Sequence, residues 1–261
     1  MQKIDSVLLD RTEEGVAIVT LNRPSVCNAV NAELTRQLEE VATQVEMDKT
    51  IRAAILCGAG SKGFSAGADL REVAAGNVAQ LSTSTGGFAG FARLPKNKVW
   101  IAAVHGAVMA GGLEIMLACD FAIASEDALF ALPEVKWGLI ASEGGLYRLP
   151  RAIPQALAME MIVTGASIQA NRAMQCGLVN RVVPAEQLKD EALAIARKVS
   201  GNAPLAVLHS KALAQQAASS LPEDTLHQLG RDVLARLQNT EDFREGPRAF
   251  IERRAPAWKG Q

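Results

Sequence analysis

The feature that most constrains this chain is a recurring combination of an apolar, strand-like run, a glycine-rich turn and the start of a helix. It occurs around Gly58–Leu70 and again around Val104–Leu117. In α/β proteins such turns lie at the carboxyl ends of strands, where ligands tend to bind. A helix start offers unpaired N–H groups and a partial positive charge, and glycine lets an oxyanion approach the backbone closely. The two turns therefore predict an α/β chain with a site for a negatively charged oxygen.

The rest of the chain alternates between strand and helix patterns. Two β-rich runs, Ser6–Thr12 and Gly15–Asn22, flank a turn and predict a hairpin. From Asn31, a predicted N-cap, apolar residues at helical spacing continue to about Asp48. Further strands are expected at 51–57, 100–105, 121–124, 129–130 and near 178–183. Strands that alternate with helices indicate a layered α/β core.

From about Pro154 onward the pattern is mostly helical, broken by Gly and Pro. We expect an α/β core with the active site over residues 1–195, followed by a C-terminal helical oligomerisation region over residues 196–261. The chain has 261 residues, enough to bury a sizeable core.

Charge and cysteine usage exclude several functional classes. The net charge is −1 and the pI about 6.3, so there is no basic excess for nucleic acid or for a polybasic membrane contact. The four cysteines are widely spaced and form no CxxC pair, which suits neither a disulfide framework nor a thiolate zinc site. The N-terminal run lacks the apolar core of a signal peptide, and no apolar stretch is long enough to span a bilayer. We expect a cytoplasmic protein.

Glu114 stands out because it interrupts an apolar tract, residues 109–124, whose character predicts burial. Buried carboxylates are unfavourable unless they are paired or functional. Gly111 and Glu114 are three residues apart, so in a helix that begins at Gly111 the carboxylate overhangs the oxyanion site. A solvated acid on an exposed helix turn is the alternative.

Glu134 follows a proline after an apolar strand, and taken alone it fits an ordinary acid in the first turn of a helix. Two carboxylates can divide proton transfer when their surroundings separate their pKa values. Together with a pair of oxyanion donors, such acids suit chemistry at the α and β carbons of an acyl group.

Three segments together carry a family resemblance. The run FSAGADL (64–70) is followed by HGAVMAGGLEIMLACDFAIA (105–124) and by LPEVKWGL (132–139). This pattern resembles the crotonase superfamily of enoyl-CoA hydratases and isomerases, and the likeness extends over almost the whole chain, from LNRPSVCNAV (21–30) to the terminal run 245–260. That terminal run and FALPE (130–134) look similar to carnitinyl-CoA dehydratase and to ordinary enoyl-CoA hydratases.

The resemblance implies a crotonase-like fold of repeated ββα units with a C-terminal helical assembly region. It also implies an oxyanion hole in which the N–H groups of Ala68 and Gly111 bind the thioester oxygen. In hydratases of the family, the glutamates matching Glu114 and Glu134 hold the water that adds to the 2,3 double bond, and one of them protonates C2. In the isomerases a single acid, matching Glu134, moves a proton between C2 and C4. A chain with both glutamates is more similar to a hydratase.

Contacts with coenzyme A or with the acyl group are implied as well. The residues expected to make them are Val26, Cys27, Ala66, Leu70, Arg71, Ser142, Phe250 and Arg253. Ser142 matches a position whose backbone N–H helps to orient the water, and residues matching Phe250 and Arg253 can reach the nucleotide of a neighbouring subunit; for Arg253 a solvated helix face is the alternative. Neither a metal nor a separate cofactor is implied, because coenzyme A is part of the substrate. The family assembles as trimers or pairs of trimers, so a homotrimer or a dimer of trimers is expected.

The chain departs from the family pattern in the loop after the second glutamate. Hydratases usually carry Pro-Gly there, and this chain has Ala141–Ser142 followed by Glu143. Serine keeps the N–H but not the conformational freedom of glycine, which puts water positioning in doubt. Glu143 is a third acid near the expected site, either a polar contact for the acyl group or an acid at a helix N-terminus. The segment Ala74–Leu94 is expected to build the acyl pocket, and its Gly, Ser and Thr content suggests mobility.

The sequence thus predicts a hydro-lyase of fatty acid metabolism that performs reversible, syn-type addition of water to a trans-2-enoyl-CoA, giving a 3-hydroxyacyl-CoA. Three alternatives stay open. The first is a Δ3-Δ2-enoyl-CoA isomerase and the second is another crotonase-family lyase similar to carnitinyl-CoA dehydratase. The third, from a different class, is a catalytically silent scaffold.

Overall fold

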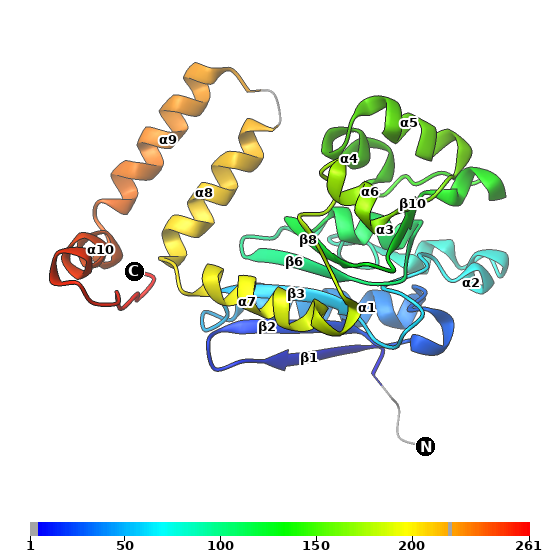
Figure 1. Ribbon diagram of the computed structural model, residues 1–261, viewed down its shortest axis with the longest axis horizontal. Helices are drawn as coiled ribbons and strands as arrows, with labels where there is room; N and C mark the ends of the chain where they lie inside the picture. The colour runs from blue at the N-terminus through cyan, green and yellow to red at the C-terminus, as the bar shows by residue number, and fades with distance from the viewer. Residues whose placement is uncertain (1–4, 219–220) are drawn as a thin grey trace.

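A twisted six-stranded sheet forms the centre of the computed structural model, which describes residues 5–218 and 221–261 (Figure 1). The first two strands form the expected antiparallel hairpin, and all other neighbours in the sheet run parallel. In spatial order the strands are β1 (Val7–Arg11), β2 (Val16–Leu21), β3 (Ala53–Gly58), β6 (Val99–Val104), β8 (Phe121–Ser125) and β11 (Arg181–Val183).

A smaller three-stranded sheet lies beside the first. It consists of β10 (Ile168–Gln169), β9 (Leu129–Ala131) and β7 (Ala107–Met109). The chain leaves β6 of the large sheet, forms β7 of the small sheet and enters helix α3 (Gly111–Leu117); it then repeats the move from β8 to β9. This alternation is the repeated ββα arrangement that the sequence resemblance implied, and it confirms the predicted α/β fold class.

Side chains of the large sheet alternate between two apolar layers, as expected for a sheet covered on both faces. On one face, Val19 and Leu21 pack with helix α1 (Ala32–Met47). On the other face, Val16 and Ile18 pack with helix α7 (Leu188–Ser200). Every strand that lies between these two helices is therefore an almost continuous apolar run.

Helix α1 begins where the sequence predicted it. The side chain of Asn31 accepts a hydrogen bond of 3.0 Å from the backbone N–H of Leu34, and Asp48 follows the last helical residue. Such a cap satisfies one of the N–H groups that a helix start leaves unpaired.

The segment from Ala74 to Leu94 is folded more tightly than its composition suggested. It begins at the end of the short helix α2 (Leu70–Ala74) and contains the 3₁₀ helix η2 (Val78–Leu81) and a hairpin of β4 (Ser82–Thr83) and β5 (Gly87–Phe88). The backbone N–H of Gly86 donates to the Glu39 carboxylate at 3.0 Å. Phe88 and Phe91 are buried, so core packing fixes the second half of this segment. The remaining short elements are η1 (Pro24–Val26), η3 (Pro133–Trp137), α4 (Gly145–Ala152), α5 (Gln155–Thr164), α6 (Ala170–Gln175) and η4 (Ala185–Gln187).

The C-terminal helices α8 (Pro204–Ala217), α9 (Glu223–Leu237) and α10 (Glu241–Glu252) form an arm (Figure 1). Helices α8 and α9 lie side by side, and α8 also reaches the core, where the Lys211 ammonium pairs with Asp120 at 2.8 Å. All residues of α8 and α9 are described, and none is buried within the chain. Helix α7 runs through the expected domain boundary at residue 195, and Ala196 and Ser200 are buried, so α7 as a whole packs with the core. The division into two domains stays a prediction.

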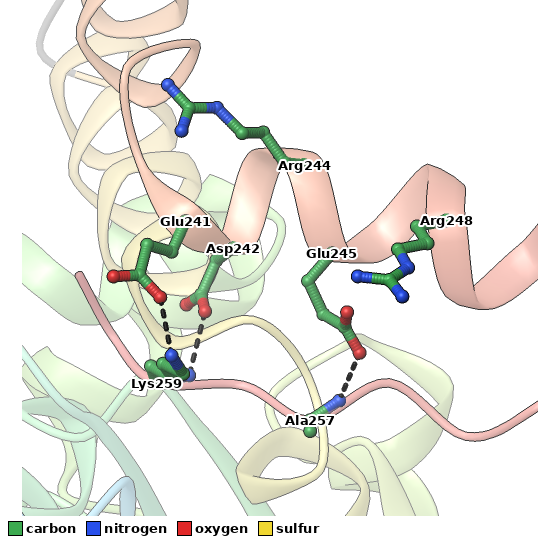
Figure 2. A pocket seen from close by; sticks show the side chains of 7 residues that line it. All are labelled: Glu241, Asp242, Arg244, Glu245, Arg248, Ala257 and Lys259. Carbon is green, nitrogen blue, oxygen red and sulfur yellow. Dashed lines mark hydrogen bonds and ion pairs between the residues drawn. The ribbon is translucent and has the colours of Figure 1, made fainter.

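Backbone hydrogen bonds hold the end of the chain against helix α10 (Figure 2). The buried carboxylate of Asp242 accepts from the N–H groups of Lys259 at 2.7 Å and Gly260 at 2.9 Å. Glu245 accepts from the N–H of Ala257 at 2.8 Å, and the Lys259 ammonium pairs with Glu241 at 2.6 Å. The pocket drawn in Figure 2 is thus walled largely by charged groups that already bind the C-terminal tail.

Across residues 5–218 and 221–261, no helix combines the length and the apolar character needed to cross a membrane.

Candidate active site

A cavity of about 470 Å³ opens beside helix α3 and receives side chains from segments far apart in the sequence. Many of the predicted site residues line it together. They are Ala66, Ala68, Leu70, Gly111, Glu114, Glu134 and Ser142, joined by Glu143. The structure therefore brings the expected oxyanion donors and the expected acids to one place.

The segments that carry Ala68 and Gly111 can approach each other because residue 67 is a glycine. Gly67 has φ +85°, and a Cβ on it would lie 2.7 Å from the Gly111 nitrogen. Gly111 is the first residue of α3, and the first N–H groups of a helix have no intrahelical acceptor. The neighbouring N–H groups are used elsewhere, since that of Asp69 donates to Val30 and that of Ala110 donates to Ala131. The two segments thus present their backbone to the cavity side by side.

Ala110 precedes α3 with φ +53°, a conformation that favours glycine. The chain therefore carries backbone strain directly before the start of α3. The surrounding turn holds this conformation in place.

Glu114 is buried, with 4% of its surface exposed. Its Oε1 accepts hydrogen bonds from the N–H of Glu143 at 2.7 Å and from the N–H of Gly145 at 3.0 Å. Burial raises the pKa of this carboxyl, and the two N–H groups oppose the rise by stabilising the charged form. Both bonds end on Oε1, which leaves Oε2 available to the cavity. Glu114 is thus set up as an anchored carboxylate.

Glu134 has a different environment. It lies in η3 directly after Pro133 and is 9% exposed. Its Oε2 is buried and has no hydrogen-bond partner among the described residues. Burial raises the pKa of Glu134 from 4.5 to about 7, and the nearby charge of Glu114 adds to the rise. This carboxyl can therefore gain and lose a proton near neutral pH.

The loop that departs from the family pattern holds Glu114. Its residue Ser142 has no positive φ, so the loop does not require glycine there. The N–H of Ser142 donates to the Ile140 carbonyl at 3.0 Å, and this bond differs from the expectation that it would orient a water. Ser142 still lines the cavity, whereas the backbone of Glu143 binds the catalytic candidate Glu114. Gly144 is the N-cap of α4, so Glu143 lies directly before that cap, which agrees with the alternative of an acid at a helix N-terminus.

Several predicted contact residues lie outside the cavity. Val26 and Cys27 belong to the neighbouring loop, where the Cys27 carbonyl accepts from the N–H of Ala66 at 2.9 Å. Arg71 is exposed on α2 and is not part of the cavity wall. Phe250 lies on α10 and Arg253 is the C-cap residue after it; both are exposed to solvent and neither lines the cavity of its own chain. Their predicted contact concerns a neighbouring subunit.

Phe88 is a residue of the site that sequence reasoning did not single out. It lies against Gly111, where an added Cβ would come within 2.4 Å of its ring. Glycine content concealed it, because Phe88 follows the pair Gly86–Gly87 that suggested a loose loop. Trp137, for which the sequence leaves both the core and the acyl pocket open, is 69% exposed and lines the cavity. His105 is hydrogen-bonded, with Nε2 2.9 Å from the Gly60 carbonyl.

Comparison with known proteins agrees with this geometry. The family model described as enoyl-CoA hydratase/isomerase matches residues 11–261. A carnitinyl-CoA dehydratase from Proteus mirabilis is 39% identical over 255 residues, which cover 96% of this chain and 97% of that protein. The crystal structure of an enoyl-CoA hydratase from Mycobacterium tuberculosis superimposes with a TM-score of 0.93 at 40% identity, covering 99% of this chain and 100% of the other. A probable enoyl-CoA hydratase/isomerase from Mycobacterium abscessus gives a TM-score of 0.91 at 41% identity, with 99% and 100% coverage. On the strength of its fold, its cavity and these matches, the chain belongs to the enoyl-CoA hydratase/isomerase family, the crotonase superfamily.

Proposed function

We propose that this protein adds water reversibly to the double bond of a trans-2-enoyl-CoA, giving a 3-hydroxyacyl-CoA. The observation that carries the proposal is that Glu114 and Glu134 line one cavity but differ in hydrogen bonding and in pKa. One carboxylate is anchored by two N–H groups, and the other has an unpartnered buried oxygen with a pKa of about 7. Such a division suits a base and an acid in one reaction.

The backbone N–H groups of Ala68 and Gly111 polarise the thioester carbonyl in this proposal. As water attacks C3, negative charge develops on the thioester oxygen through the conjugated system. Donors positioned for such charge are each worth roughly 10²–10³ in rate in other enzymes. Because both donors are backbone groups at tight turns, they need no rearrangement when the charge forms.

The two acids account for the protons. Glu114 accepts a proton from the attacking water as the water oxygen bonds to C3. Glu134 donates its proton to C2, and the π electrons of the double bond end in the new C2–H bond. Afterwards Glu114 is protonated and Glu134 ionised, and exchange through solvent restores the starting state. Both acids line one cavity, and we propose that oxygen and hydrogen reach the same face of the double bond, as in syn addition. These steps use only the thioester, water and side chains of this chain, so we propose no separate cofactor and no metal.

The relatives support a reaction that moves water. A hydratase adds water to an enoyl-CoA, and a dehydratase named for carnitinyl-CoA removes water from a CoA thioester, which is the reverse step. Dehydration of a 3-hydroxyacyl-CoA with a polar acyl group is therefore the second candidate, and Glu143 in the cavity favours it. An isomerase is less well supported, because it would leave Glu114 without a role.

Incubation with trans-but-2-enoyl-CoA tests the proposal. The absorbance of the conjugated thioester should fall for the wild type. Glu114→Gln and Glu134→Gln should each slow this loss by about 10²–10⁴, the usual contribution of a positioned acid or base. An isomerase would instead convert a 3-enoyl-CoA and keep that activity in Glu114→Gln. Wild-type turnover in both variants would exclude the assignment, and a wild type silent on a panel of acyl groups would indicate a scaffold.

We also propose that the chain assembles as a homotrimer or a dimer of trimers. The arm α8–α10 supports this, because α8 and α9 bury none of their residues within the chain while Phe250 and Ile251 are exposed on α10. Exposed apolar surface of this kind is typical of an assembly face. Light scattering behind size exclusion chromatography would distinguish the trimer, the hexamer and the monomer.

A further inference from the structure

The guanidinium of Arg148 lies against the turn that holds Glu114. The two N–H groups that bind Glu114 belong to Glu143 and Gly145, on either side of Gly144. Gly144 has φ +140°, and a Cβ on it would lie 2.7 Å from Nη1 of Arg148. The backbone N–H of Arg148 also donates to the Gly144 carbonyl at 2.7 Å. Because residue 144 has no side chain, the guanidinium can lie next to the backbone between the two donors.

A second contact fixes the guanidinium to another segment of the chain. Nη2 of Arg148 donates to the Ala92 carbonyl at 2.7 Å, and Ala92 is fully buried. The segment that contains Ala92 also contains Phe88, whose ring lies against Gly111. Arg148 therefore joins the turn 143–145 to the segment beside the proposed oxyanion donor.

The positive charge of Arg148 is held without an ion pair. Among the ion pairs between described residues, none includes Arg148. Its Nη1 is buried and has no hydrogen-bond partner in the part of the chain that the structure describes. The guanidinium carbon lies 5.6 Å from the centre of the Tyr147 ring, within the range of a cation–π contact. The charge also acts on Glu114, where it opposes the rise in pKa that burial causes.

Other titratable groups act on this pair or feel its charges. They are Glu143, Glu134, Lys96 and Cys119. The two glutamates disfavour a further negative charge at Glu114, because like charges repel. Burial raises the pKa of Cys119 to about 12, so this thiol is uncharged near neutral pH. Arg148 is thus a cation that offsets the acids around Glu114.

We propose that Arg148 is a positioning residue for Glu114: it fixes the turn 143–145, which supplies both N–H groups, and it places a positive charge near that carboxylate. The inference rests on the proposed function, in which Glu114 takes a proton from water and must therefore be ionised. Arg148 does not line the cavity, so it acts through Glu114 and not on the substrate.

The pH dependence of hydration tests the effect of the charge. The acidic limb of kcat/KM for trans-but-2-enoyl-CoA reports the ionisation of the base. In Arg148→Gln this limb should move to higher pH, so the activity relative to the wild type should be about three- to tenfold lower at pH 5 than at pH 7. Arg151→Gln removes an exposed arginine of the same helix and should leave the profile unchanged. An equal loss at both pH values in Arg148→Gln would leave only a structural role and overturn the inference.

Arg148→Lys separates the charge of the side chain from its shape. Lysine keeps the charge but lacks the planar fork that reaches Ala92 and Gly144 together. This variant should lower kcat about tenfold at every pH, because the turn is held less firmly, and its acidic limb should stay at the wild-type position. Wild-type kcat in Arg148→Lys would overturn the role in holding the turn, and this result can be obtained even if Arg148→Gln does not fold.

A titration without substrate separates failure of this inference from failure of the proposed function. The infrared carboxyl bands of Glu114 are isolated by subtracting the spectrum of Glu114→Gln from that of the wild type, and in the same way within the Arg148→Gln protein. The pKa of Glu114 should be higher in Arg148→Gln than in the wild type. An unchanged pKa would overturn the inference whether or not the protein turns over. A higher pKa in a protein that hydrates no enoyl-CoA would remove the proposed function and leave the effect of Arg148 on Glu114.

Discussion

The backbone N–H of Glu143 donates a 2.7 Å hydrogen bond to Oε1 of Glu114. The two residues are 29 positions apart, and the bond joins the loop that departs from the family pattern to the acid that the pattern preserves. Any residue other than proline at position 143 supplies this N–H. The side chain at 143 is therefore free to vary, and in this chain it places a carboxylate in the cavity.

The rate of hydration should depend on pH through Glu134. Its pKa of about 7 means that the proton it donates to C2 in the proposed reaction is lost as the pH rises through neutrality. We expect kcat/KM for trans-but-2-enoyl-CoA to fall about tenfold per pH unit above that value. A profile measured from pH 6 to 9 checks this. A rate constant that stays level across the range would show that Glu134 is not the proton donor.

The free energy of unfolding should also depend on pH through Glu134, and it should fall as the pH rises. The folded-state pKa of Glu134 lies above its ordinary 4.5, so its contribution to folding is present below pH 4.5 and is lost as the pH rises to about 7. Glutamine does not ionise, so Glu134→Gln does not lose stability in this pH range through position 134. In urea unfolding the variant should gain about 1–2 kcal/mol relative to the wild type between pH 5 and pH 8, because partial solvent access to the carboxyl screens the effect. The same difference at both pH values would contradict the buried, proton-binding environment, and Glu160→Gln, which removes an exposed acid on α5, should show no such trend.

The close packing of Phe88 against Gly111, at the start of α3, allows an experiment in which a second substitution restores activity. In Gly111→Ala, the new Cβ would lie 2.4 Å from the Phe88 ring, so the ring or the turn must shift. We expect a loss of stability of about 1–3 kcal/mol, as in other overpacked cores, together with a fall in kcat. Phe88→Leu in the same chain should restore part of the kcat by making room. If the double variant is no faster than Gly111→Ala, the loss has another origin than the contact with Phe88.

The C-terminal tail should depend on Asp242. Its buried carboxylate accepts from the N–H groups of Lys259 and Gly260, so Asp242→Ala leaves both donors without their partner. We expect the free energy of unfolding to fall by about 2–3 kcal/mol, since bonds to a charged group are among the stronger ones. Asp232→Ala on the exposed face of α9 is the control. Circular dichroism during denaturation measures the change, and an unaltered midpoint would show that the tail does not depend on Asp242.

The local features of the fold could be predicted from short stretches of sequence. Alternating apolar residues predicted the hairpin, and the cap at Asn31 with helical spacing predicted α1, because these signals act between residues that are close in the chain. The spacing of Gly111 and Glu114 likewise placed both on one turn of α3. The family motifs extended this to the expected oxyanion donors.

Only the tertiary structure decided how the separate turns meet. The close approach of the Gly67 backbone to Gly111, the burial of Glu134 and the bond from Glu143 to Glu114 all depend on segments whose distance in sequence carries no signal of contact. The pKa values of the two acids depend on that packing, because burial and the direction of backbone N–H groups set them. The sequence by itself determined which elements form and which side chains could react. The long-range packing of those elements determined which carboxylate is anchored by backbone N–H groups, which one has its pKa raised to about 7 by burial, and that a third one lines the same cavity.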